Sequence, residues 1–336
     1  MKPPLIRRKE YVKKILQSRY HNKASNQYVN TFKPANIALI KYWGKRCGIL
    51  NLPLVSSLSY SMNGYGSKLE ICLNKEKDII IYNGVLLKTN IREAKRIIDF
   101  LDIFRLQEEY FFVKTSNNIP TAAGLASSAS GFAALSNGLN ILKNWEATDI
   151  ELSLLARLGS GSACRSFINN NNLAYWHCGK EENGLDSFAE PTDITPDFYM
   201  AAIIIRDKEK KILSREAMKI SLIDQKKKEK WKNEQAQDLE QAINFLKCKN
   251  FKKFGNIVEE NSKRLHDLLS SSTPPIIYDT EKTIAIKEKI PSFRKNGLPI
   301  YFTQDAGANI KVIFPKNSLG NIKKLFSTHQ LEYFCI

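Results

Sequence analysis

The first two hundred residues alternate short apolar runs with helical patterns. Runs of four to eight residues that are rich in β-branched and aromatic side chains predict strands, and apolar residues repeated every three or four positions predict helices. Asn83-Gly84, between two of these runs, favours a tight hairpin turn. The predicted strands are 28–40, 69–73, 79–82, 85–87, 110–115, 173–177 and 199–206, and the predicted helices are 91–104, 131–142 and 150–158, the last closed by the glycines of 159–161.

The pattern changes near residue 200. Residues 217–269 are highly charged and carry a helical repeat, and 284–289 continue in the same style. Two short strands, 297–303 and 310–314, then flank a polar turn. We therefore expect three parts: a basic extension over 1–27, a first lobe over 28–200 and a second lobe over 201–336.

The extension is basic and has no apolar core of the kind that a signal peptide needs. Tyr11, Val12, Ile15 and Leu16 allow a short helix around 10–20, which would serve as a contact for nucleic acid or a partner. A poorly ordered extension is the stronger expectation. Its cations, against a lone Glu10, are Arg7, Arg8, Lys9, Lys13, Lys14 and Arg19.

Composition narrows the class of protein. The 336 residues suffice for one large domain or two ordinary ones, and no stretch approaches the roughly 18 apolar residues of a membrane span. The net charge of +17 favours anionic partners, such as nucleic acid, membrane surfaces or phosphorylated small molecules, unless lysine serves only to solubilise the chain. The six cysteines show no paired short spacing, and the four histidines are scattered. We expect reduced thiols in a cytoplasm, and no zinc site.

One stretch is unusually small and uncharged. Residues 118–132 run from a turn-favouring Asn-Ile-Pro through Thr-Ala-Ala-Gly-Leu-Ala-Ser-Ser into an apolar helical pattern. Bare backbone N–H groups ahead of a helix N-terminus suit a phosphate group, although a tightly packed helix start would have the same composition. No Gly-Lys-Ser/Thr follows, so this is not a Walker A loop.

Three other segments combine charged groups with small residues. Residues 34–46 place Lys41, Lys45 and aromatics directly after an apolar strand; 158–166 combine glycine and serine with Arg165; 302–309 set Asp305 beside a glycine turn. From the residues alone, Asp305 is as much a turn-capping residue as a base. A planar guanidinium such as that of Arg165 can grip a carboxylate with two parallel hydrogen bonds.

In this order, the four segments closely resemble those of the mevalonate diphosphate decarboxylases, a family of the GHMP kinase superfamily. The matching stretches are Asn-Ile-Ala-x-x-Lys-Tyr-Trp-Gly-Lys-Arg, Pro-Thr-Ala-Ala-Gly-Leu-Ala-Ser-Ser-Ala, Gly-Ser-Gly-Ser-Ala-Cys-Arg-Ser and Asp-Ala-Gly-x-Asn. The resemblance covers roughly residues 28 to 315. It implies an α+β protein of two lobes, the first like domain 2 of ribosomal protein S5 and the second ferredoxin-like, with the active site in the cleft between them.

The resemblance also implies a reaction. ATP phosphorylates the C3 hydroxyl of mevalonate 5-diphosphate, and loss of that phosphate with carbon dioxide leaves isopentenyl diphosphate. Mg²⁺ would bridge phosphate oxygens without a permanent protein site. A mevalonate monophosphate decarboxylase or a mevalonate 3-kinase of the same superfamily is the nearest alternative. A basic nucleic-acid-binding protein is the alternative from another class, but the chain lacks aromatics interleaved on a basic strand.

The resemblance assigns a role to each site residue. Asp305 is the base, Lys41 is its cationic partner and Arg165 holds the substrate carboxylate. The other substrate-binding residues are Tyr42, Trp43, Lys45, Ser160, Ser162, Ser214 and Arg215. The ATP-binding residues are Pro120, Ala123, Gly124, Leu125, Ala126, Ser127 and Ser128, and Ser128 is also a candidate Mg²⁺ ligand.

Two features depart from the family pattern. After Cys-Arg-Ser the family usually has a short aromatic-Gly-Gly turn, whereas this chain has 166–173, which is longer and has no glycine. The basic extension before Tyr28 is also unusual. We expect a cytoplasmic homodimer that binds a small-molecule substrate and neither nucleic acid nor membrane.

Overall fold

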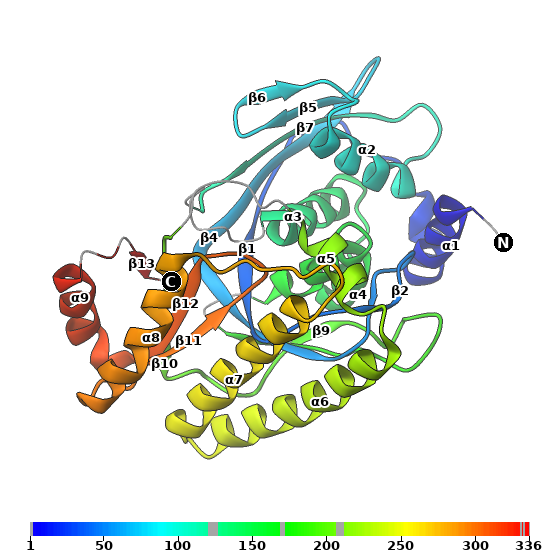
Figure 1. Ribbon diagram of the computed structural model, residues 1–336. Coiled ribbons are helices and arrows are strands. Elements are labelled where there is room, and N and C mark those ends of the chain that lie inside the picture. Colours follow the sequence, from blue (N-terminus) through cyan, green and yellow to red (C-terminus); the bar gives the residue numbers. More distant parts are fainter. Residues whose placement is uncertain are drawn as a thin grey trace.

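The computed structural model describes residues 3–119, 127–168, 172–205, 212–329, 331 and 333–335. The chain forms two lobes, each built around a sheet (Figure 1). This is the predicted α+β, two-lobed architecture.

The first lobe contains a seven-stranded sheet in the order β6-β5-β7-β4-β8-β9, with β1 also paired to β4. The long strand β4 is central because β1, β7 and β8 all pair with it in antiparallel register. The strands of this lobe are β1 (Val29–Ile40), β2 (Lys45–Cys47), β3 (Leu52–Pro53), β4 (Ser57–Asn74), β5 (Ile79–Tyr82), β6 (Val85–Leu87), β7 (Tyr110–Asn117), β8 (Leu173–Trp176) and β9 (Ala189–Pro191). The helices are α1 (Pro4–Leu16), η1 (Gln17–His21), α2 (Arg92–Phe104), α3 (Ser127–Leu142), α4 (Asp149–Arg157) and η3 (Gly161–Phe167).

The second lobe contains a four-stranded antiparallel sheet in the order β11-β12-β10-β13. Its strands are β10 (Phe198–Ile203), β11 (Tyr301–Gln304), β12 (Ile310–Pro315) and β13 (Tyr333–Cys335). Its helices are α5 (Ser214–Ser221), α6 (Gln225–Lys247), α7 (Phe251–Ser270), α8 (Glu281–Lys295), η4 (Lys316–Ser318) and α9 (Leu319–Thr328).

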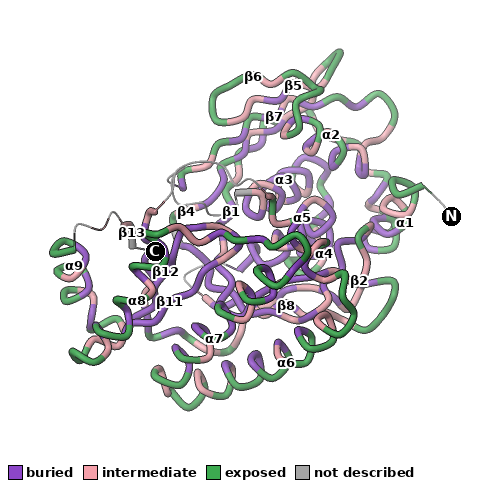
Figure 2. Tube along the Cα trace, in the orientation of Figure 1, coloured by how far each residue is buried: buried purple, intermediate pink, exposed green. Residues whose placement is uncertain are grey.

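Both faces of this second sheet are buried. Because successive side chains of a strand point to opposite faces, alternate residues pack against different helices. On β12, Val312 packs into the core formed with α8 and α9, whereas the neighbouring Ile313 packs into the core formed with α6 and α7. That second core also contains Ile37 and Leu39 of β1, so the two lobes share buried apolar surface. Figure 2 shows β11 and β12 as mainly buried, whereas β6 and much of α6 are exposed.

Local sequence explains several element ends. Helix α4 begins with a capping box, in which the side chains of Thr148 and Glu151 each bond the other residue's backbone. Asn83 and Gly84 both have positive φ, as the predicted hairpin turn requires. The glycines after α4 do not close the helix with left-handed backbone, because neither Gly159 nor Gly161 has positive φ; the chain continues into η3 instead.

The N-terminal extension corrects an expectation. Residues 4–16 are not a poorly ordered segment: they form α1, whose buried side chains, Tyr11, Val12, Ile15 and Leu16, join the core of the first lobe. The apolar residues recur at helical spacing, and Pro4 occupies the first turn, where its missing N–H costs nothing. Burial of this stripe outweighs the repulsion among the surrounding cations.

Strand β4 was predicted too short. It begins at Ser57, twelve positions before the predicted start at residue 69. Ser57, Ser59 and Ser61 are fully buried, so the run does not read as apolar in the sequence. Among the described residues, no helix is both long enough and apolar enough to cross a membrane.

Candidate active site

A cavity of about 360 Å³ lies between the lobes, with lining residues from both. Six cationic side chains line it, and Asp305 is the one carboxylate among the lining residues that the structure describes. The cations are Lys41, Lys45, Arg92, Arg96, Arg165 and Arg215. A cavity with this charge balance suits a ligand that carries several negative charges.

Asp305 follows β11 and is bound by two lysines. Its Oδ1 lies 2.8 Å from Nζ of Lys41, and its Oδ2 lies 3.2 Å from Nζ of Lys311. Burial alone would raise the pKa of Asp305, but the two ammonium groups outweigh it and hold that pKa far below its usual range. About a third of the side chain (34%) remains accessible from the cavity, so the ionised carboxylate can meet a ligand.

Lys41 directly follows the apolar strand β1 and is almost fully buried, with 2% of its surface exposed. Its Nζ donates to the carbonyl of Ala38 (2.9 Å) as well as to Asp305, and its backbone N–H donates to Asn261 (2.9 Å). Burial lowers the pKa of Lys41 to about 8, and the Asp305 charge opposes this shift. The predicted pairing of Lys41 with Asp305 is therefore present.

Arg165 lies in η3 with its guanidinium held in place. Its Nε donates to Oδ1 of Asn36 and its Nη1 to Oγ of Ser57, both at 3.0 Å. Burial lowers the pKa of Arg165, and the group is charged at neutral pH nonetheless. Since Nη2 has no hydrogen-bond partner among the described residues, the guanidinium can offer donors to a ligand in the cavity.

Three hydroxyl groups line the cavity beside Arg165. Oγ of Ser160 lies 3.3 Å from Oγ of Ser128 and 3.5 Å from Oγ of Ser162. Gly161 between the two serines is required by close packing, because a Cβ there would lie 2.5 Å from Oη of Tyr42. The fold thus brings four predicted site residues together at this cavity: Ser128, Ser160, Ser162 and Arg165.

The two aromatic residues after Lys41, Tyr42 and Trp43, both line the cavity, and Trp43 also packs in the core. Tyr42 is half-buried, and its hydroxyl is enclosed and has no hydrogen-bond partner among the described residues. Loss of solvent around this hydroxyl raises the pKa of Tyr42. Trp43 lines the cavity but also packs with Trp231, and its Nε1 donates to Oγ of Ser221 (2.9 Å). Both residues meet the cavity, and Trp43 is also a core residue.

Lys45, Ser214 and Arg215 lie at one part of the same cavity. Nζ of Lys45 lies 2.5 Å from Oδ1 of Asn51. Burial and then the nearby cations, Arg215 first, lower the pKa of Lys45 to about 8. Ser214 and Arg215 form the first turn of α5. Two cationic groups and one hydroxyl, all hydrogen-bond donors, therefore line the cavity here.

The small-residue loop lies mostly outside the described residues. Pro120, Ala123, Gly124, Leu125 and Ala126 are not described, and Ser127 begins α3. Ser128, one position into the helix, lines both this cavity and a second cavity of about 410 Å³. Arg92 and Arg96 also line both. The ligand contacts predicted for the loop itself remain predictions.

The sequence analysis missed two cations that line the cavity, the second lysine that pairs with Asp305, and the two residues that hold Arg165. Arg92 and Arg96 are four positions apart on the predicted helix 91–104, a spacing that places them on one face. Lys311 interrupts the apolar strand β12 and is 1% exposed, which was a visible signal in the sequence. Asn36 opens the first of the four matching stretches, but neither Asn36 nor Ser57 was predicted as a partner of Arg165, because small polar residues in strands are usually exposed.

Two family models match this chain. Residues 33–189 match the diphosphomevalonate decarboxylase-like N-terminal domain, and residues 200–333 match the mevalonate 5-diphosphate decarboxylase C-terminal domain. The chain belongs to the diphosphomevalonate decarboxylase family. The recognised resemblance is thereby confirmed.

Relatives with this name align over most of their length. The diphosphomevalonate decarboxylase of Debaryomyces hansenii is 32% identical over 321 residues, covering 88% of this chain and 82% of the relative. That of Saccharomyces cerevisiae is 30% identical, covering 90% and 85%.

Solved structures of the family share the fold. The mevalonate diphosphate decarboxylase from Staphylococcus aureus has a TM-score of 0.84 and 32% identity, covering 91% of this chain and 95% of the other. A complex of MDDEF with MVAPP, AMPPCP and magnesium has a TM-score of 0.84 and 34% identity, covering 92% and 96%. The predicted GHMP-kinase fold is confirmed by these similarities.

Proposed function

We propose that this chain decarboxylates mevalonate 5-diphosphate to isopentenyl diphosphate, using ATP and releasing ADP, phosphate and carbon dioxide. The observation that carries the proposal is the cavity lined by six cations together with the ionised Asp305, which pairs with Lys41. The substrate carries a diphosphate, a carboxylate and a C3 hydroxyl, and this cavity offers a matching group for each. Membership of the decarboxylase family supports the same conclusion.

Asp305 orients the C3 hydroxyl and takes its proton. Because Lys41 and Lys311 lower its pKa so far, the carboxylate is a weak base before the reaction begins. Proton transfer therefore belongs late in phosphoryl transfer, when the oxygen–phosphorus bond is forming and the hydroxyl has become acidic. The two lysines keep the carboxylate ionised and fixed in place until then.

Arg165 binds the substrate carboxylate that leaves as carbon dioxide. Its guanidinium is fixed by Asn36 and Ser57, so little side-chain freedom is lost when a carboxylate binds. Ser160 and Ser162 add hydroxyl donors beside it. Fixing the carboxylate while the C3 phosphate departs favours cleavage of the carbon–carbon bond over simple hydrolysis.

Lys45, Ser214 and Arg215 bind the diphosphate. All three side chains line the cavity; the positive charges of Lys45 and Arg215 suit phosphate oxygens, and the hydroxyl of Ser214 can donate a hydrogen bond to one. Because the pKa of Lys45 is about 8, most of this side chain is protonated at neutral pH and contributes positive charge.

ATP binds across the two cavities that share Ser128, Arg92 and Arg96. The cations and the start of α3 suit the phosphates, and the second cavity, lined partly by Leu69, Ile97 and Phe132, suits a purine. Bound Mg²⁺ would neutralise phosphate charge, and the hydroxyl of Ser128 is the side chain best placed to reach it.

A substrate panel tests the proposal. The protein is incubated with ATP, Mg²⁺ and each of mevalonate, its 5-phosphate and its 5-diphosphate, and ADP and carbon dioxide are measured separately. Equal release of both from the 5-diphosphate is the expected result. ADP without carbon dioxide would indicate a 3-kinase, and preference for the 5-phosphate would indicate the monophosphate decarboxylase.

We also propose that the enzyme is a cytoplasmic homodimer whose lobes divide near residue 200. The two family matches, ending at 189 and beginning at 200, support the division. Light scattering after size-exclusion chromatography tests the oligomeric state: a mass of one chain would contradict the dimer.

A further inference from the structure

Helix α1 lies before residue 33, where the family match begins, yet it is built into the first lobe. One face of the helix is buried, and the opposite side presents exposed cations. Two polar side chains of α1 also reach inward. Nε of Arg8 donates to the carbonyl of Ile49 at 2.9 Å, and the hydroxyl of Tyr11 accepts from Nη2 of Arg157 at 2.6 Å.

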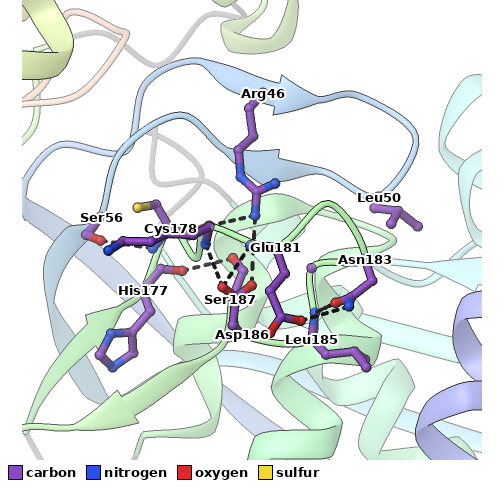
Figure 3. Close-up of polar contacts among 12 residues, drawn as sticks. Arg46, Leu50, Ser56, His177, Cys178, Glu181, Asn183, Leu185, Asp186 and Ser187 are labelled. Atoms are coloured by element: carbon purple, nitrogen blue, oxygen red, sulfur yellow. Dashed lines mark hydrogen bonds and ion pairs between the residues drawn. The ribbon is translucent and has the colours of Figure 1, made fainter.

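Arg157 connects α1 to the segment before β3. This fully buried side chain donates from Nε to the carbonyl of Leu50 (3.1 Å) and from Nη2 to that of Gly184 (3.1 Å). Its Nη1 donates to the carbonyl of Ser187. Figure 3 shows Leu50 and the 181–187 turn, where Asp186 accepts the backbone N–H groups of residues 180 and 181.

Asn51 completes the connection to the cavity. Its side-chain N–H₂ donates to the carbonyls of Arg157 (2.8 Å) and Leu158 (3.0 Å), and its Oδ1 lies 2.5 Å from Nζ of Lys45. Residues 49, 50 and 51 are thus each held by a separate hydrogen bond to α1, Arg157 or the end of α4. Lys45 is positioned by the last of them.

We propose that α1 is a working part of the substrate site, and that Arg8 is a positioning residue for the diphosphate. Arg8 fixes the 49–51 segment on which Lys45 depends, and its guanidinium adds positive charge behind Lys45 and Arg215. This inference rests on the proposed function, which places the diphosphate at those two residues.

The electrostatics agree with the geometry. Burial is the main cause of the lowered pKa of Arg8, and the charge of Arg215 adds to it. The charge of Arg8 in turn helps lower the pKa of Lys45. A bound diphosphate attracts each of these cations and so offsets their mutual repulsion. Each cation therefore strengthens the binding of a multiply charged anion.

The experiment compares Arg8→Gln with Arg7→Gln, which removes the same charge one position earlier on the same helix. The side chain of Arg7 makes no described hydrogen bond or ion pair, so this variant controls for charge alone. In steady-state assays at saturating ATP, Arg8→Gln should raise KM for mevalonate 5-diphosphate about three- to tenfold, with kcat within about twofold. Arg7→Gln should change neither, and Arg8→Lys should recover part of the loss.

Other outcomes overturn the proposal in distinguishable ways. If Arg8→Gln leaves KM unchanged while Arg215→Gln raises it, the diphosphate site is correct and α1 only stabilises the fold. If Arg8→Gln lowers Tm and raises the KM of ATP equally, its role is structural and the positioning role is wrong. If Arg215→Gln also leaves KM unchanged, the proposed diphosphate site itself is misplaced.

Discussion

Nζ of Lys311 lies 3.2 Å from Oδ2 of Asp305. Lys41 binds the other oxygen of the same carboxylate at 2.8 Å, so a single acid is held between two buried cations. Such an acid stays ionised at low pH, but it is a weak base, and the balance between these effects should be visible in the pH dependence of the reaction.

Replacing Lys311 should shift the acidic limb of the reaction. Lys311→Met keeps the volume of the side chain and removes one of the two charges that lower the pKa of Asp305. The pKa therefore rises, and the fall of kcat/KM on acidification should begin at higher pH than in the parent enzyme. Lys287→Met, which removes a lysine paired with Asp279 instead, is the control. An unmoved acidic limb in Lys311→Met would show that Asp305 does not set it.

Asp305→Asn should abolish most turnover without unfolding the chain. Asn has nearly the same shape and can still bond the C3 hydroxyl, but it cannot take the proton, and general-base terms are typically worth about 10²–10⁴ in rate. The loss should lie near the upper end, because the lost charge also holds Lys41. ADP and carbon dioxide should decrease together, since phosphorylation comes first. Near-parent phosphorylation with intact nucleotide binding would reduce Asp305 to a turn-capping residue.

Arg165→Lys should reduce turnover although it conserves charge. Lysine cannot span Asn36 and Ser57 and also present a planar pair of donors to a carboxylate. We expect kcat/KM to decrease about 10- to 100-fold, with Tm within a few degrees of the parent. Normal turnover combined with a large decrease in Tm would mean that Arg165 supports the fold and does not bind substrate.

The alkaline limb should report Lys41 and Lys45 together. Burial lowers the pKa of each to about 8, so both are charged below that pH and lose their charge above it. We therefore expect kcat/KM for the diphosphate substrate to decrease as pH rises through about 8, with a log–log slope approaching about two. Lys45→Arg keeps its charge at high pH and should reduce the slope toward about one. An unchanged slope would show that Lys45 does not titrate in this range.

Leu16→Ala should destabilise the protein strongly if α1 belongs to the core. Leu16 is fully buried, and truncating such a residue typically costs about 2–5 kcal/mol of unfolding free energy. Leu5, which is 41% exposed on the same helix, provides the control, and Leu5→Ala should cost less than about 0.5 kcal/mol. Urea unfolding measures both, and equal small losses would contradict the packing of α1.

The sequence by itself determined most elements and the set of chemical groups. Periodicity located α2 and α3, Asn83-Gly84 predicted its turn, and the four motifs supplied Asp305, Lys41 and Arg165 as candidate site residues. The predictions of the two helices and the turn are confirmed because they depend on local spacing and residue type, both of which are visible in the chain; the roles of the three site residues stay predictions. The same local view missed the start of β4, where buried serines hide the apolar pattern.

Only the tertiary structure decided which residues of the different motifs contact one another and which other residues surround them. Lys41 and Asp305 are 264 positions apart, and their contact exists because the two lobes pack β1 against the second sheet. The sequence shows Lys311 as a cation within an apolar strand, but only the tertiary structure shows that it pairs with Asp305 and that α1 packs on the first lobe, because such contacts depend on which surfaces meet. A basic amphipathic stretch at a chain end has the same sequence whether it stays in solvent or packs; here the apolar surface of the first lobe decided that it packs.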